Sequence, residues 1–71
     1  MNDQPKLIDA PIATTMNDRI KAVQREIQLR KRVYPRWVEA GKLKPEAAAF
    51  QIKCMEDVYE MLVRLQHTMD V

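Results

Sequence analysis

Two stretches of apolar residues at heptad spacing, separated by the chain's only glycine, constrain the fold most strongly. The first seam comprises Met16, Ile20, Val23, Ile27, Arg30, Tyr34 and Trp37, and the second comprises Ala48, Met55, Val58, Leu62, Leu65 and Met69. Alternating steps of three and four residues are typical of α-helices that pack along a shared seam. The sequence therefore predicts two packed helices, with Arg30 as the one polar residue in the first seam.

The start of the first helix is marked by Thr15, with Asp18 three residues later as an imperfect capping box. Pro35 interrupts the same helix, because it has no N–H to donate to the carbonyl of Lys31. We expect either a kink near Pro35 or a stop at Val33 followed by a short new turn.

The end of the first helix and the start of the second are marked by Gly41 and Pro45. Glycine accepts the left-handed backbone that ends a helix, and proline suits a first helical position. The expected helices span about residues 16–40 and 45–69. An all-α fold follows, an antiparallel αα-hairpin.

The second helix carries an apolar arc wider than about 200°, whereas one facing helix needs about 100°. A further part of this chain or a second chain must therefore cover the rest of the arc. Pairing of two hairpins into a dimeric four-helix bundle is the preferred solution. The competing solution uses residues 1–14, an N-terminal arm with two prolines that is flexible or packed in extended form. Residues 15–71 form the hairpin domain.

Charge divides between the two predicted helices. Residues 16–44 hold nine cations against three carboxylates (+6), and residues 45–71 hold two against five (−3). A basic helix attracts phosphates or an acidic protein surface. The candidate binding residues are Arg25, Arg30, Lys31, Arg32, Tyr34, Arg36, Trp37, Lys42 and Lys44.

Three of these candidates have two possible roles. Arg30 either packs its stem and extends its guanidinium into solvent, or pairs with Glu56 or Glu60. The seam register turns Tyr34 and Trp37 inward as core residues. If Trp37 is instead exposed at the hairpin tip, it becomes a candidate interface anchor.

No catalytic, metal or cofactor site is predicted. The chain has no serine, and its one cysteine, Cys54, is expected to be a small buried hydrophobe. His67 lies thirteen residues further on, about 20 Å along a helix, too far to form a pair with Cys54. The start lacks a signal-peptide pattern, and no apolar run is long enough to cross a membrane. A soluble, cytoplasmic, non-enzymatic protein is expected.

Residues 26–62 resemble a group of small phage and prophage proteins of unknown function, which look like helical hairpins. The resemblance lies in VYPRWV and the following GKL, that is Val33, Tyr34, Pro35, Arg36, Trp37, Val38, Gly41, Lys42 and Leu43. It implies an accessory protein made in the cytoplasm of a bacterial host. Such proteins often bind a host enzyme, such as RNA polymerase, a nuclease or a defence complex.

Three functions follow as hypotheses. The leading one is an interaction protein that uses its basic helix and hairpin tip to bind and inhibit a host protein with an acidic surface. The second is a nucleic-acid-binding protein that places the first helix on phosphates. The third is a structural or assembly subunit.

Overall fold

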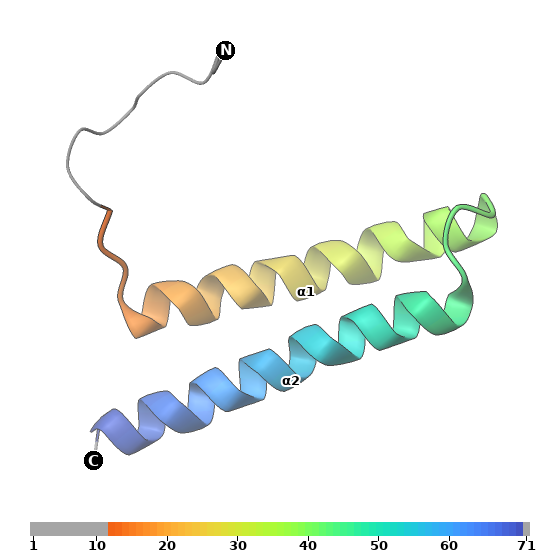
Figure 1. Ribbon diagram of the computed structural model, residues 1–71. Helices are drawn as coiled ribbons and strands as arrows, with labels where there is room; N and C mark the ends of the chain where they lie inside the picture. The colour runs from red at the N-terminus through yellow and green to blue at the C-terminus, as the bar shows by residue number, and fades with distance from the viewer. Residues whose placement is uncertain (1–11, 71) are drawn as a thin grey trace, which may run out of the picture.

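Two long helices lie side by side and antiparallel, joined by a short turn (Figure 1). The structure is a computed structural model that describes residues 12–70, with side chains up to residue 69. Helix α1 spans Met16–Glu39, and helix α2 spans Pro45–Asp70. Within the described range there is no strand. The predicted αα-hairpin is therefore confirmed.

Helix α1 begins with a complete capping box. The backbone N–H of Asp18 donates to the Thr15 hydroxyl oxygen at 3.0 Å, and the Thr15 N–H donates to the Asp18 carboxylate at 2.9 Å. Thr15 itself has an extended backbone (φ −96°, ψ 166°), as an N-cap residue requires. The pKa of Asp18 is lowered, mainly by the hydrogen bond from the Thr15 backbone and next by the Thr15 side chain.

Helix α1 continues through Pro35 to Glu39 without a break. The alternative in which the helix stops at Val33 is therefore wrong, whereas a kink at Pro35 stays a prediction. Pro35 is exposed, so its ring occupies no space between the helices. Pro35 has no N–H to donate to the Lys31 carbonyl, and this carbonyl lies less than three turns from the end of α1. A single missing hydrogen bond there does not end α1.

The turn after α1 is a Schellman motif centred on Gly41. The Lys42 N–H donates to the Trp37 carbonyl at 2.8 Å, and the Gly41 N–H donates to the Val38 carbonyl at 3.0 Å. Gly41 has φ 75°, a left-handed conformation that glycine adopts without a steric cost. Helix α2 starts directly at Pro45, as predicted.

The interior of the hairpin is small. Only Ile20, Ile27 and Ala48 are buried among the residues that the structure describes. Most other seam residues are half-buried, whereas Trp37 at the end of the first seam and Leu65 and Met69 at the end of the second are exposed. Two helices in contact along one line leave most of each surface in water. As for the N-terminal arm, residues 12–14 have no secondary structure, and residues 1–11 lie outside the described range.

Replacing Gly41 by alanine should destabilise the hairpin by about 1–2 kcal/mol, the cost of a left-handed conformation for a residue with a Cβ atom. No heavy atom lies within 4 Å of the position of that Cβ, so the cost comes from the backbone alone. Gly41→Asn should cost less, because asparagine tolerates this conformation. Urea unfolding followed by circular dichroism measures both, and equal stability of Gly41→Ala and the wild type would contradict the assignment.

Asp18 should have a pKa below the usual range for aspartate, because the Thr15 backbone N–H donates to its charged form and the Thr15 side chain lowers the pKa further. Its folded-state pKa is lowered, so its contribution to stability is present above the unfolded pKa. That contribution is lost as pH falls through the folded pKa. Carboxyl NMR of Thr15→Ala should show a higher Asp18 pKa, whereas Thr14→Ala should leave it unchanged. An Asp18 pKa that does not respond to Thr15→Ala argues against the capping box.

Candidate functional site

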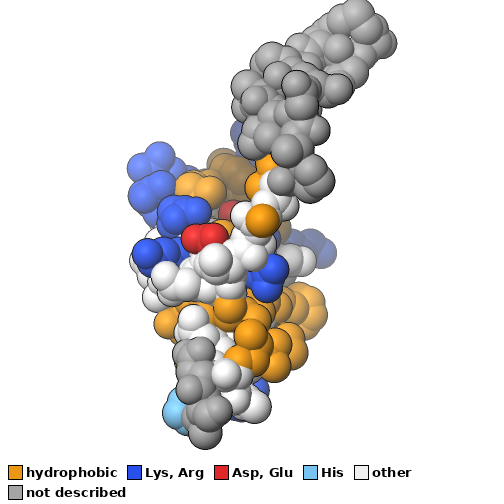
Figure 2. All heavy atoms as spheres, turned by 90° about the vertical axis from the view of Figure 1, so that its left-hand side faces the viewer, with side chains coloured by type: hydrophobic (Ala, Val, Ile, Leu, Met, Phe, Trp, Pro, Cys, Tyr) orange, Lys and Arg blue, Asp and Glu red, His pale blue; other side chains and the backbone are white. Residues whose placement is uncertain are grey.

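The two sides of the hairpin differ in their chemistry. On one side, the Gln24 amide donates to the Tyr59 hydroxyl at 3.2 Å, and Lys31 pairs with Glu56. On the other side, Arg30 bonds to the backbone of α2 at Gln51. Seen from the open end of the hairpin, most cationic side chains in view gather on one side along α1, and apolar side chains gather on the opposite side over α2, where fewer cations are seen (Figure 2).

A shallow groove runs along the cationic side of α1 and reaches α2. We call it the basic groove; its lining comprises Lys21, Gln24, Arg25, Ile27, Gln28, Leu29, Arg32, Glu56 and Tyr59. Lys21, Arg25 and Arg32 follow one another at intervals of four and seven residues, which places them on one face of the helix. None of the three forms an ion pair with another residue of the described range.

The one carboxylate of the basic groove is already engaged. Glu56 accepts from Lys31 Nζ at 3.0 Å, across the two helices. Both side chains are more than two-fifths exposed, so this pair fixes the register of the helices more than it stabilises them. Lys31 is therefore occupied, and the groove keeps its three unpaired cations.

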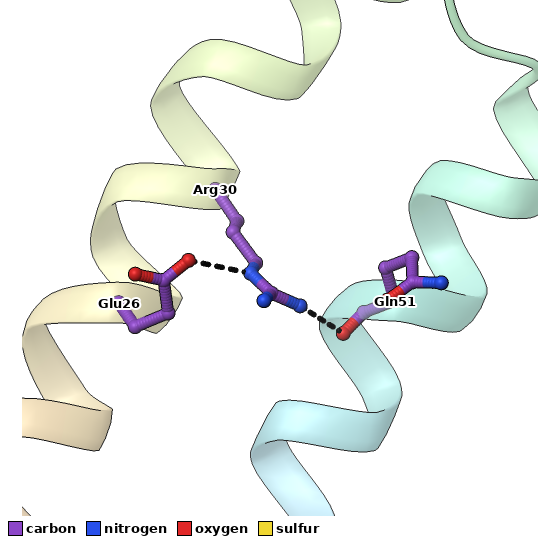
Figure 3. A network of polar contacts seen from close by, with 3 residues as sticks. All are labelled: Glu26, Arg30 and Gln51. Atoms are coloured by element: carbon purple, nitrogen blue, oxygen red, sulfur yellow. Dashed lines mark hydrogen bonds and ion pairs between the residues drawn. The ribbon is translucent and has the colours of Figure 1, made fainter. Parts of the chain in front are cut away.

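Arg30 lies on the other side of the hairpin and is bonded within the chain (Figure 3). Its Nε contacts Glu26 Oε2 at 2.7 Å, and its Nη1 donates to the Gln51 carbonyl at 3.1 Å. The guanidinium carbon also lies 5.9 Å from the centre of the Tyr34 ring. The hydrogen bond to Glu26 raises the pKa of Arg30.

Both expectations for Arg30 are therefore corrected. Its partner is Glu26, one turn earlier on the same helix, and neither Glu56 nor Glu60. Its side chain is 21% exposed, so the guanidinium is not extended into solvent. Arg30 thus joins α1 to α2 and is not available as a free binding cation.

Tyr34 and Trp37 stack on each other near the hairpin tip, with ring centres 5.6 Å apart and planes at 29°. Tyr34 is half-buried, but Trp37 is 46% exposed. The expectation that Trp37 faces inward is therefore wrong, because the helices separate around the turn and no α2 side chain encloses the ring. The alternative of an exposed tryptophan at the tip agrees with the structure.

The remaining predicted site residues are Arg36, Lys42 and Lys44. All three are exposed, and none forms an ion pair within the part of the chain that is described. They do not line the basic groove. The groove instead includes residues that the sequence reasoning missed, namely Lys21, Gln24, Gln28, Leu29 and Tyr59. Only Lys21 could have been found, since it lies one turn before Arg25 on the same face.

Two further properties bear on the class of site. Cys54 is exposed, so its expected burial is wrong. Across residues 12–69, no three His, Cys, Asp or Glu side chains are grouped as metal ligands would be. Neither α1 nor α2 is long and apolar enough to cross a membrane, as far as the described residues extend.

Comparison with protein-family models, with curated proteins and with solved structures finds no match. The resemblance of residues 26–62 to phage hairpin proteins therefore stays a prediction from the sequence. What the chain does has to be argued from its own surfaces.

Arg30→Lys should destabilise the hairpin by about 1 kcal/mol, although it keeps the charge. A lysine ammonium is a compact point charge and cannot bond Glu26 and the Gln51 carbonyl through a planar fork. Arg36→Lys is the matched control, because Arg36 is exposed and has no ion pair among the described residues. Urea midpoints that fall equally in both variants would contradict a bridging role for Arg30.

Proposed function

We propose that this chain is a non-enzymatic binding protein whose basic groove docks on an acidic segment of another protein and blocks it. The observation that supports this function is the set of three unpaired cations, Lys21, Arg25 and Arg32, in one concave surface with apolar neighbours. Cations on a concave surface attract and orient an oppositely charged partner more effectively than the same charges spread over a convex one.

The mixed lining of the groove favours a protein partner over nucleic acid. Leu29 is 43% exposed in the groove, and Tyr59 presents a half-buried ring. A segment with alternating carboxylates and apolar side chains can engage both kinds of lining residue. Phosphates can engage only the cations, and the acidic half of the chain, residues 45–71 at −3, lies beside them. The nucleic-acid alternative predicts a steep loss of affinity between about 50 and 200 mM salt.

The resemblance to phage proteins suggests the setting of this function. In that setting the chain is an accessory protein that acts in the cytoplasm of a bacterial host. Its partner is then a host protein with an acidic surface, of the kind found in RNA polymerase, nucleases or defence complexes. The exposed Trp37 at the tip supplies a second anchor, since tryptophan is enriched among the residues that dominate binding energy.

The proposed working form is a pair of hairpins, a dimeric four-helix bundle. The small interior supports this proposal, because a hairpin with three buried side chains has little apolar burial to stabilise it. A third function, as a subunit of a larger assembly, predicts instead a discrete oligomer above the dimer.

Arg25→Glu combined with Arg32→Glu should abolish partner capture while leaving helicity unchanged, because both residues line the groove and are exposed. The matched control is Lys42→Glu with Lys44→Glu, which makes the same change in charge outside the groove. Tagged wild type and both variants are incubated with nuclease-treated bacterial lysate, washed at moderate salt and compared by mass spectrometry.

The wild type and the Lys42/Lys44 control should retain the same stoichiometric protein, and the Arg25/Arg32 variant should lose it. Equal loss in both variants would show that net charge, not the groove, governs binding. If a protein is captured only when the nuclease treatment is omitted, the result supports the nucleic-acid alternative.

A further inference from the structure

The side of the hairpin opposite the basic groove is apolar, and no other part of the described chain packs on it. At 100° per residue, one arc of α2 turns toward this side. Its members are Ala47, Phe50, Gln51, Cys54, Val58, Met61, Leu65, Thr68 and Met69. None of them is charged, and Phe50, Met61, Leu65 and Met69 are 48–64% exposed. We call this surface, together with Val23, Val33 and Trp37 of α1, the apolar flank.

The charges that α1 contributes to the middle of this flank are neutralised within the chain. Arg30 and Glu26 pair with each other at 2.7 Å, and Arg30 also bonds to the Gln51 carbonyl and lies against Tyr34. A charge pair with its hydrogen bonds already formed can be covered at a lower desolvation cost than a free charge. The middle of the flank is therefore suited to burial. Near the open end, Arg19 lies on the same face of α1 as Trp37, eighteen residues earlier, and its guanidinium donates to Thr14.

The contrast with the basic groove is informative. There the cations Lys21, Arg25 and Arg32 form no pair among the described residues, as suits a surface that meets opposite charge. The α2 arc of the apolar flank has no charge, and the α1 charges in its middle are paired with each other, so this part offers no electrostatic attraction to an acidic partner. The basic groove and the apolar flank are therefore expected to bind different partners.

We infer that the apolar flank is the surface on which a second copy of this chain docks, the same face on both copies. A helix of 26 residues is about 39 Å long. Two helices about 10 Å apart, each about 10 Å wide, make a face about 20 Å across. A face of the hairpin therefore covers on the order of 800 Å², which matches the area that each partner buries in a stable interface. The pairing covers the flank and leaves both basic grooves exposed.

Avoidance of like charge selects one arrangement of the two copies. A two-fold axis along the helices places α1 of each copy beside the uncharged arc of α2 of the other, so the two basic segments, residues 16–44 at +6, do not face each other. An axis across the helices would stack the basic helix on its own copy, which is unfavourable. In the selected arrangement both hairpin tips lie at the same end of the bundle.

The test is a comparison of two leucines of similar exposure on opposite sides of the hairpin. Leu65 on the apolar flank is 48% exposed, and Leu29 in the basic groove is 43% exposed. Leu65→Glu should raise the dissociation constant of the dimer at least about 100-fold, because it places a charge within a desolvated contact. Leu29→Glu should leave it within about threefold. Sedimentation equilibrium of the full chain measures both.

Cys54 provides a second readout that does not depend on the folding of a variant. Its thiol is exposed in the single chain and lies within the apolar flank. Alkylation of the wild type by iodoacetamide should therefore be fast in dilute solution and slow at concentrations where the dimer forms. Protection that does not vary with concentration would mean that residues 1–11 cover the flank, and would overturn the second-copy proposal.

This inference deepens the proposed pairing and is independent of the acidic partner. A monomer at all concentrations, with Cys54 reactive throughout, would overturn the pairing itself. A dimer that tolerates Leu65→Glu but not Leu29→Glu would keep the pairing and overturn the choice of face. Neither result changes what the Arg25/Arg32 variant shows about partner capture.

Discussion

The whole structure depends on how little two helices can bury against each other. Ile20, Ile27 and Ala48 are the buried residues of the described chain, and every other large apolar side chain keeps contact with water. Because folding of a small domain leaves little net stability, such a hairpin has to gain further apolar burial from outside itself. In the proposed pairing, a second copy supplies this burial and so adds to the stability of the hairpin.

The bonds that Arg30 forms within the chain explain how one short hairpin can present two unlike surfaces, the basic groove and the apolar flank. Arg30 occupies a seam position where an apolar residue would be expected, yet its bonds to Glu26 and Gln51 satisfy it within the chain. It joins the helices and adds no free charge to the apolar flank. Three other cations of α1, Lys21, Arg25 and Arg32, line the basic groove. Separation of charge from apolar surface thus follows from the register of one helix.

Local features of the fold were readily predicted from the sequence. The Thr15 cap, the left-handed Gly41 and the start of α2 at Pro45 each depend on residues within a few positions, so their chemistry can be recognised in the sequence. The continuation of α1 through Pro35 was harder to predict, because the cost of one lost hydrogen bond has to be compared with the stabilisation from the bonds that hold the last turn.

Features of the site were less predictable, because they depend on how α1 and α2 are rotated about their axes. Trp37 and Cys54 belong to apolar patterns and were expected inside, but the facing helix is too narrow to cover them. The partner of Arg30 depends on side-chain reach, which seam spacing does not report. Lys21 has the spacing of a groove residue, whereas the role of Tyr59 requires knowing which side of α2 meets α1.

The most direct test of this account is an isotope-filtered NMR experiment on a mixture of labelled and unlabelled chains, which detects contacts between copies only. The account predicts contacts that connect the methyl groups of Val23 in one copy with those of Met61 in the other, because α1 lies beside α2 of the second copy at that level. Contacts centred on Leu29, or an absence of contacts between copies at millimolar concentration, would contradict it.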